Sequence, residues 1–217
     1  MEQALTASDF AEYLSDDEIS KMAPLIDRLK TLEEQKTSQD NYLKFVKKIW
    51  PSFIEGKHHK IYADKLQKVA DGKIKRLIVN MPPRHTKSEF ASYLFPAWLM
   101  GRRPDLKIIQ ATHTAELAVG FGRKVKNLID SDDFRDIFPE IKLATDAKAS
   151  GRWSTNGGGE YYAVGVGGAL AGRGADLCII DDPVSEQDAL SPTALDSIYE
   201  WYTSGPRQRL QPGGSII

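Results

Sequence analysis

Hydrophobic positions along the chain change their spacing near residue 60. Before about residue 50 they recur every three or four residues, as in amphipathic helices. Ser15 and Glu18 form a capping box at the start of the first helix, and Pro51 closes the second. We predict an N-terminal helical segment over residues 1–50, with a flexible polar linker at 36–40. Its apolar positions are Ile19, Met22, Leu25, Ile26, Leu29 and Leu32, followed by Tyr42, Leu43, Phe45, Val46, Ile49 and Trp50.

After residue 60, short apolar runs alternate with stretches of helical spacing. This order of strands and helices predicts an α/β fold with a mainly parallel sheet that helices cover on both faces. The run 77–81 is almost wholly apolar, as expected of a buried parallel strand. The other predicted strands are 107–111, 161–164 and 177–180, and the predicted helices are 62–70, 88–100, 115–129 and one that begins at Ser191-Pro192.

Composition narrows the class of protein but does not point to a ligand. The chain has 217 residues, of which 41% are hydrophobic, enough for one packed domain with some peripheral structure. Its net charge of −1 provides no global positive field that would attract nucleic acid. The single cysteine, Cys178, lies in an apolar run and reads as a core residue in a reducing compartment. We see no signal peptide and no membrane-spanning run, so we expect an intracellular protein without membrane contact.

Residues 77–88 have the order strand, turn, Lys-Ser, helix. A P-loop wraps backbone N–H groups around a phosphate and adds the positive end of the following helix. Lys87 would then reach the β- and γ-phosphates of a nucleotide, and the Ser88 hydroxyl would bind Mg²⁺. The two glycines of the usual pattern are replaced by Met81 and Thr86, and a β-branched Thr86 is expected to resist the torsions that glycine accepts.

A second motif strengthens the interpretation of residues 77–88 as a phosphate-binding loop. Four apolar residues, 177–180, end in Asp181 and Asp182, as in a Walker B strand. The carboxyl ends of parallel strands meet at one edge of the sheet, so both aspartates are expected near Lys87. Adjacent carboxylates at a buried strand end favour a shared cation. Together the two motifs predict nucleotide binding with Mg²⁺, although aspartates that merely cap a helix remain the simpler alternative for the second motif alone.

The loop 82–89 resembles the deviant Walker A of one branch of tailed-bacteriophage large terminases. The resemblance runs from about Trp50 to Ile217 and also rests on motifs at 111–118, 121–123, 138–139, 172–176, 181–184, 201–202 and 212–214. It implies an additional-strand, RecA-like P-loop ATPase domain over residues 51–217. The nucleotide-binding residues implied are Pro83, Arg84, His85, Thr86, Lys87, Ser88 and Glu89, with Ser88 and Asp181 as metal ligands.

The same resemblance implies the cofactors, the partners and the setting. ATP and Mg²⁺ are the cofactors, and hydrolysis drives double-stranded DNA into a capsid through a portal protein. The other partners implied are the small terminase subunit and further copies of this chain in a ring, in the cytoplasm of the infected bacterial host. In this family a C-terminal nuclease domain follows the ATPase domain. Because the chain ends at the start of a strand, we expect it to stop before the family's coupling motif and that nuclease domain.

Two positions depart from the family pattern. Large terminases usually carry a glutamate after the Walker B aspartate, to polarise the attacking water, whereas this chain has Asp182. Either Asp182 activates the water, which we favour slightly, or Glu186 reaches in from the following loop. The usual Walker A arginine lies four residues before the lysine, where Pro83 stands here, and Arg84 is one place closer. Whether Arg84 contacts the γ-phosphate is therefore left open by the match.

Arg173 is the remaining catalytic candidate. It lies between two glycines in a Gly-rich loop, 165–174, that precedes the Walker B run. Such an arginine can stabilise phosphate charge in a neighbouring subunit or contact DNA, and an ordinary exposed loop residue is an equally good interpretation.

Three functions compete at this stage. The first is a Mg-dependent ATPase motor for duplex DNA. The second is another P-loop DNA-dependent ATPase such as a helicase. The third is a nucleotide-gated assembly module with little hydrolysis, which the missing glycines and the missing glutamate favour. Phosphate release separates the third from the first, and dependence on duplex DNA separates the first from the second.

Overall fold

The fold is that of a computed structural model, which describes residues 16–147 and 149–217. Contacts divide the chain into two compact units, Met1–Thr37 and Ser38–Ile217. In the first unit the described part is helical and belongs to α2 (Asp16–Asp40), so the predicted helix is confirmed. Ser15 of the predicted capping box lies outside the described residues. The helix has an exposed stripe of apolar side chains: Met22, Leu25, Ile26, Leu29 and Leu32.

The flexible linker predicted at residues 36–40 is wrong, because α2 continues through all of them. Their side chains are polar, but Ser38 and Gln39, the first residues of the second unit, are held in it by hydrogen bonds. The indole N–H of Trp98 donates to the carbonyl of Ser38 at 3.0 Å, and the Gln39 amide donates to the carbonyl of Ile137. Polarity alone therefore predicted flexibility where backbone and side-chain hydrogen bonds hold the chain.

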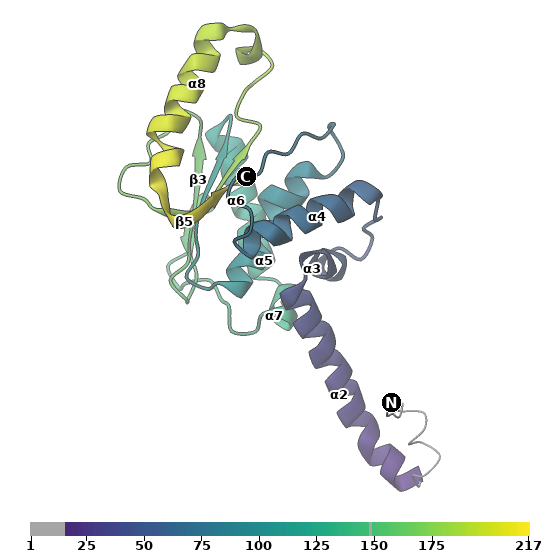
Figure 1. The fold of residues 1–217 in the computed structure, drawn as a ribbon. Helices are drawn as coiled ribbons and strands as arrows, with labels where there is room; N and C mark the ends of the chain where they lie inside the picture. Colours follow the sequence, from purple (N-terminus) through teal and green to yellow (C-terminus); the bar gives the residue numbers. More distant parts are fainter. Residues whose placement is uncertain (1–15, 148) are drawn as a thin grey trace. The chain divides into compact units, whose positions relative to one another are not determined.

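The second unit is an α/β domain (Figure 1). Its helices are α3 (Tyr42–Ile49), α4 (Lys57–Ala70), α5 (Phe95–Arg102), α6 (Ala115–Ile129), α7 (Asp132–Ile137) and α8 (Pro192–Ser204). Three shorter turns are the π-helical η1 (Glu89–Leu94) and the 3₁₀ turns η2 (Asp188–Leu190) and η3 (Pro206–Arg209). The strands are β1 (Lys107–Thr112), β2 (Arg152–Ser154), β3 (Glu160–Gly165), β4 (Ala175–Asp181) and β5 (Leu210–Ile216).

The five strands form one sheet in the order β2-β3-β1-β4-β5. All neighbouring pairs are parallel except β2 with β3, so the predicted mainly parallel sheet is confirmed. Strand β1 lies in the middle, and its last residue, Thr112, pairs with Asp181 at the end of β4. The three-residue β2 was not predicted, because it is too short to carry an alternating pattern.

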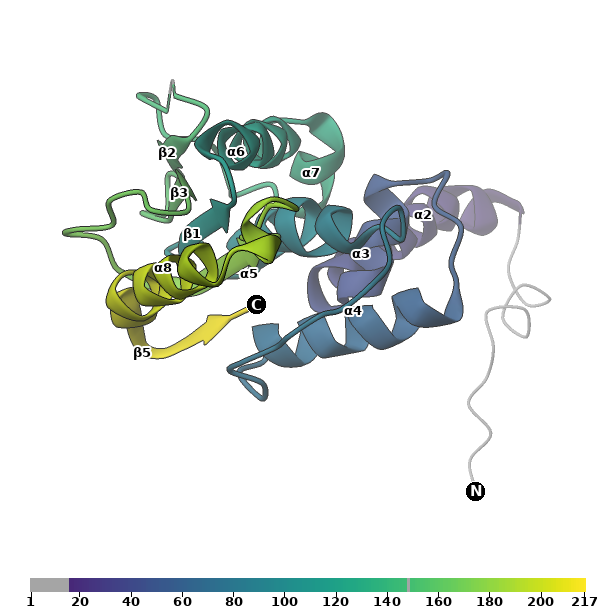
Figure 2. The ribbon, with the colours of Figure 1, turned by 90° about the horizontal axis from the view of Figure 1, so that it is seen from above.

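Helices cover both faces of the sheet, as the alternation of strands and helices predicted (Figures 1 and 2). Successive residues of a strand point to opposite faces. Ile108 and Leu177 pack in the larger core with α3, α4, α5 and α6, whereas Ile109 and Cys178 pack in the smaller core beneath α8. Burial raises the pKa of the Cys178 thiol to about 12, which fits the predicted core residue.

Sequence signals for helix ends agree with the structure. The Thr114 hydroxyl accepts from the N–H of Leu117 at the start of α6, and the Ser191 hydroxyl accepts from the N–H of Ala194 at the start of α8. Gly72 closes the turn after α4 with a φ of 74°. These local contacts fix where α6 and α8 begin, and so where the loops that precede them must pass.

The strand predicted at residues 77–81 is not formed. Arg76 makes an isolated parallel bridge to Ile216, and the N–H of Leu77 donates to the Ile216 carbonyl. Beyond Leu77 the chain runs without a regular element, and Ile78 is 87% exposed. Strand β5 ends beside Arg76, so residues 78–81 have no strand alongside them in the described chain. The apolar composition of residues 77–81 favours a strand, but a strand also needs a neighbouring strand to which its backbone can hydrogen-bond. Among the described residues, no helix combines the length and the apolar character needed to cross a bilayer.

Candidate nucleotide site

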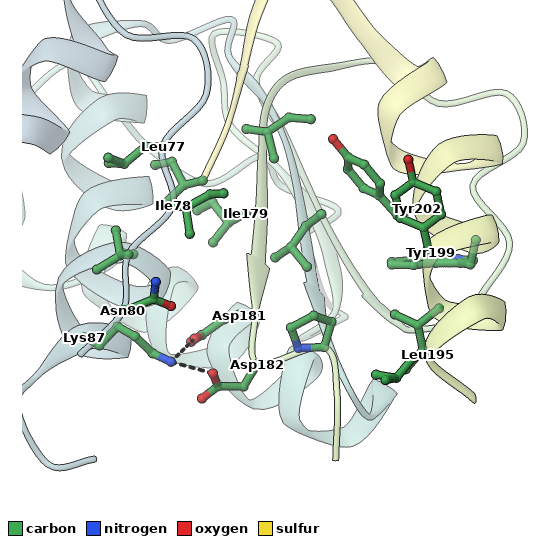
Figure 3. Close-up of a pocket in the computed structure, with 18 of the residues that line it drawn as sticks. Leu77, Ile78, Asn80, Lys87, Ile179, Asp181, Asp182, Leu195, Tyr199 and Tyr202 are labelled. Atoms are coloured by element: carbon green, nitrogen blue, oxygen red, sulfur yellow. Dashed lines mark hydrogen bonds and ion pairs between the residues drawn. The ribbon is translucent and has the colours of Figure 1, made fainter. Parts of the chain in front are cut away.

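Three charged side chains from distant parts of the sequence meet at the carboxyl edge of the sheet (Figure 3). The Lys87 ammonium lies 2.5 Å from a carboxylate oxygen of Asp182 and 3.7 Å from one of Asp181. The Asp181 side chain is 9% exposed and that of Asp182 is 69% exposed. The lysine thus offsets the charge of two adjacent carboxylates, of which one is fixed in the sheet and the other faces solvent.

Lys87 stands where a loop becomes a helix. Residues 82–86 form an irregular loop, the helix begins at Lys87, and it passes through η1 into α5. Arg84 and Thr86 have positive φ values of 62°, and Asp182 has a φ of 45°. Residues other than glycine rarely adopt this left-handed backbone conformation, and those that do cluster at functional sites. Thr86 thus adopts the glycine-like torsion that its β-branched side chain is expected to resist.

Two tyrosines hold the start of this helix from behind. The Tyr62 hydroxyl of α4 donates to the Lys87 carbonyl at 3.2 Å, and the Tyr42 hydroxyl of α3 donates to the Phe90 carbonyl at 2.6 Å. Burial raises the pKa of both phenols, which keeps them protonated and able to donate. The π-helical turn has a wider hydrogen-bond spacing than an α-helix, and such turns often mark functional sites.

A buried chain of hydrogen bonds supports Asp181. The hydroxyl of Ser92, on η1, donates to the second carboxylate oxygen of Asp181 at 2.8 Å. The side-chain amide of Gln110, on β1, donates to the Ser92 oxygen at 3.2 Å. Ser92 and Gln110 are fully buried. Asp181 is therefore held by Lys87 on the solvent side and by Ser92 from within, which fixes its orientation at the strand end.

Two hollows open beside these charges. The first has a volume of about 430 Å³ and is lined by Val79, Asn80, Met81, Pro82, Lys87 and Asp182. The second, of about 520 Å³, extends from Lys87 and Asp181 to the apolar face of α8, where Leu195, Tyr199 and Tyr202 line it (Figure 3). Both volumes are within the range of small-molecule sites. Lys87 and Asp182 line both hollows, but the remaining walls of the second are mostly apolar, so the first is the one that better suits a phosphate group.

The predicted site residues do not all lie at this edge. Lys87, Asp181 and Asp182 come together, and the loop carries Pro83, Arg84 and His85 with exposed side chains. Half-buried Ser88 and Glu89 follow Lys87 at the start of the helix. Glu186 is exposed in the turn before η2.

Arg173 is far from these groups. It precedes the first residue of β4, whereas Asp181 is the last, so roughly 20 Å of strand separates the two ends. Its guanidinium lies over the ring of Tyr162, on β3, at 3.9 Å from the ring centre. The backbone of Arg173 thus lies near the amino edge of the sheet, whereas its guanidinium lies over Tyr162, which is in register with Ile109 and Cys178 in the middle of the sheet.

The side chains present fit a hydrated Mg²⁺ ion. This ion prefers oxygen ligands, keeps several waters and uses one or two carboxylates together with substrate phosphates. Asp181 presents one oxygen toward Lys87 while Ser92 holds the other. In the described part of the chain no group of three or more His, Cys, Asp and Glu side chains could hold a metal alone. A Mg²⁺ ion here would therefore depend on phosphate oxygens for part of its ligand set.

Several supporting residues were not predicted. Tyr62, Ser92 and Gln110 lie in segments assigned to a helix or a strand, and nothing in their spacing marks them as polar contacts of the site. Gln110 carried the only available signal, since it is a polar residue inside the apolar run 107–111. A buried amide there requires a partner.

No protein-family model matches the chain, and no curated protein matches it.

Proposed function

We propose that this chain is a Mg-dependent ATPase and the motor domain of a viral large terminase, which drives double-stranded DNA into a capsid. The observation that carries the proposal is the meeting of Lys87 with Asp181 and Asp182 at the carboxyl edge of a parallel sheet. Lys87 begins a helix after a loop with left-handed residues, and a polar hollow lies beside it. These are the parts that hold nucleotide phosphates in P-loop proteins.

The strand order supports the additional-strand class of P-loop ATPases. Strand β5 is hydrogen-bonded to β4, which ends in Asp181, and its far side pairs with the segment that leads to Lys87. One strand thus separates the strand of the aspartates from the chain that enters the loop. This arrangement favours a RecA-like P-loop fold over a dinucleotide-binding fold, in which no such motif pair is expected.

The roles proposed for the side chains follow from their positions. With nucleotide bound, Lys87 would contact the β- and γ-phosphates, and Asp181 and Ser88 would hold Mg²⁺, which would supply positive charge beside the phosphates. Asp182 is the better candidate to activate water, because it lines the hollow beside Lys87 whereas Glu186 is exposed in the next turn. Arg84 lies in the same loop with an exposed side chain and is the further candidate to contact the γ-phosphate.

The motor itself rests on the resemblance to large terminases. Duplex DNA, a portal protein and a small terminase subunit are its proposed partners, and the host cytoplasm is its proposed location. A ring of identical chains would supply Arg173 in trans.

The test is phosphate release from Mg-ATP by the wild-type chain and by Lys87→Ala. We expect slow turnover in the wild type, because neighbouring subunits are absent, and none in the variant, with circular dichroism unchanged. Lys107→Ala is the matched control: Lys107 forms an exposed ion pair with Glu160 at the start of β1, and its loss should leave turnover unchanged. Equal turnover in Lys87→Ala and wild type contradicts the assignment of the loop.

Duplex DNA then distinguishes the competing functions. Stimulation by double-stranded DNA more than by single strands supports a packaging motor, and the reverse preference supports a helicase. Tight Mg-ATP binding without phosphate release, with or without DNA, supports the nucleotide-gated assembly module.

A further inference from the structure

Thr86 adopts a backbone conformation that a β-branched residue disfavours. Its φ of 62° is in the left-handed region, where the Cβ branches crowd the backbone and glycine is the usual residue. Thr86 directly precedes Lys87, so this torsion sets the direction in which the loop enters the helix. Some contact must hold it there.

His59 supplies that contact from α4. The N–H of Gly56 donates to Nδ1 of His59 at 2.8 Å, so Nδ1 is the acceptor and the ring proton is on Nε2. Nε2 lies 2.9 Å from the Thr86 hydroxyl oxygen and donates to it. The hydroxyl in turn donates to the carbonyl of His85 at 2.6 Å. Each donor in this series of three hydrogen bonds has one acceptor, and the Gly56 N–H fixes the direction of the series.

The imidazole is itself held firmly. It is 6% exposed, its ring centre lies 4.7 Å from that of Phe53, and it stacks on Phe90 at 5.3 Å with an interplanar angle of 21°. Phe90 belongs to η1, the first turn after the loop. The ring therefore bridges α4 to both the loop and the helix that follows it.

We propose that His59 is a positioning residue that holds Thr86 in its left-handed conformation and so keeps the phosphate loop ready to bind nucleotide. The pair His59 and Thr86 does here what a glycine does alone in the usual loop. This inference rests on the proposed nucleotide site, but the contact between His59 and Thr86 can be tested without a nucleotide.

The anchor should weaken in acid. Burial and the neighbouring His58 lower the pKa of His59, with a smaller lowering by His85 of the loop and an opposing effect of Glu55. Glu55 is paired with Lys47 and Lys60. A protonated ring loses its acceptor at Nδ1, so the Gly56 contact breaks and the ring is held only by its bond to Thr86 and by Phe53 and Phe90.

A double-mutant cycle between His59→Ala and Thr86→Gly tests the proposal with a fluorescent Mg-ADP analogue. We expect His59→Ala to weaken binding roughly 5- to 10-fold, the size of one hydrogen bond together with a released strained residue. In the Thr86→Gly background the same substitution should change binding less than about 2-fold, because glycine needs no anchor. His59→Gln, which keeps a donor within reach of Thr86, should recover part of the loss. Asp64→Ala, exposed on the same helix, is the control.

Tryptic cleavage after Arg84, in the exposed loop, gives the readout without nucleotide. His59→Ala should speed cleavage several-fold. Lowering the pH toward 5 should speed it in the wild type but not in His59→Ala, when each rate is divided by that of an unstructured peptide to correct for the loss of trypsin activity in acid. The proposal is overturned if His59→Ala changes cleavage and binding equally whether residue 86 is threonine or glycine. A wild-type chain that binds no Mg-nucleotide, yet shows the cleavage coupling, refutes the nucleotide site and retains the anchor only as a loop contact.

Discussion

Removing the Ser92 hydroxyl should destabilise the domain and loosen Asp181 together. In Ser92→Ala the carboxylate of Asp181 loses a 2.8 Å hydrogen bond from inside the core, and the Gln110 amide loses its acceptor. A hydrogen bond to a charged group contributes about 1.5–3 kcal/mol, and a buried donor left without a partner costs about 1–3 kcal/mol. The two effects share atoms and do not add fully, so we expect a loss of roughly 2–4 kcal/mol in the free energy of unfolding.

Thermal unfolding followed by circular dichroism measures this loss. For a domain of this size each kcal/mol lowers Tm by about 2–4 °C, so Ser92→Ala should melt roughly 5–15 °C below the wild type. Ser215→Ala is the matched control, because Ser215 is also buried but makes only a long 3.5 Å bond to the carbonyl of Ile74. Its loss should lower the free energy of unfolding by less than about 1 kcal/mol.

The same variant tests whether Ser92 orients Asp181 for a metal. Affinity for Mg-ATP should fall several-fold at a temperature where Ser92→Ala is still folded, while Ser215→Ala binds as the wild type does. A Tm as high as that of Ser215→Ala refutes the energetic reasoning. A lowered Tm with unchanged Mg-ATP affinity leaves Ser92 as a stabilising core residue and removes it from the site.

Three more outcomes follow from the positions of charged groups. Asp181→Asn should weaken Mg-dependent nucleotide binding, whereas Asp182→Asn should bind Mg-ATP and hydrolyse it poorly; equal losses of binding, measured by titration of a fluorescent analogue, make Glu186 the candidate base. Arg173→Ala should leave the affinity for Mg-ATP unchanged in a single chain, because roughly 20 Å of strand separates it from Asp181, and should lower turnover only in assembled protein, as phosphate release checks. The pKa of His59 is lowered in the folded state, so on acidification the unfolded chain takes up this proton first. The free energy of unfolding, measured in urea, should therefore decline as the pH falls below about 6.5. His59→Gln should make this dependence on pH less steep.

Local signals in the sequence predicted most of the sheet and the helix boundaries. Apolar runs located β1, β3 and β4, and Thr114 and Ser191 marked the starts of α6 and α8, because these features depend on a few neighbouring residues. The two motifs also predicted that Lys87 lies close to Asp181 and Asp182, and it does. Parallel strands align their carboxyl ends, and this is a property of topology that the sequence order carries.

The errors occurred where distant contacts decide the outcome. Residues 77–81 have the composition of a strand but no strand beside them, and residues 36–40 have the composition of a linker but hydrogen bonds to Trp98 and Ile137 in the fold. Nothing near His59 along the chain indicates its contact with Thr86, 27 residues away. A strained residue and its anchor become visible together only when the chain is folded.

Strand β5 links the two halves of the site mechanically. Its end is hydrogen-bonded on one side to Lys75 and Leu77, on the segment that leads to the loop, and on the other side to Cys178 and Ile180, on the strand of Asp181. A backbone hydrogen-bond ladder resists stretching along its bonds. A shift of the end of β5 therefore moves the segment that leads to Lys87 relative to the strand that ends in Asp181. Force applied along this one strand would therefore change the width of the hollow beside Lys87 and Asp182, and closure of that hollow would pull on the strand in return.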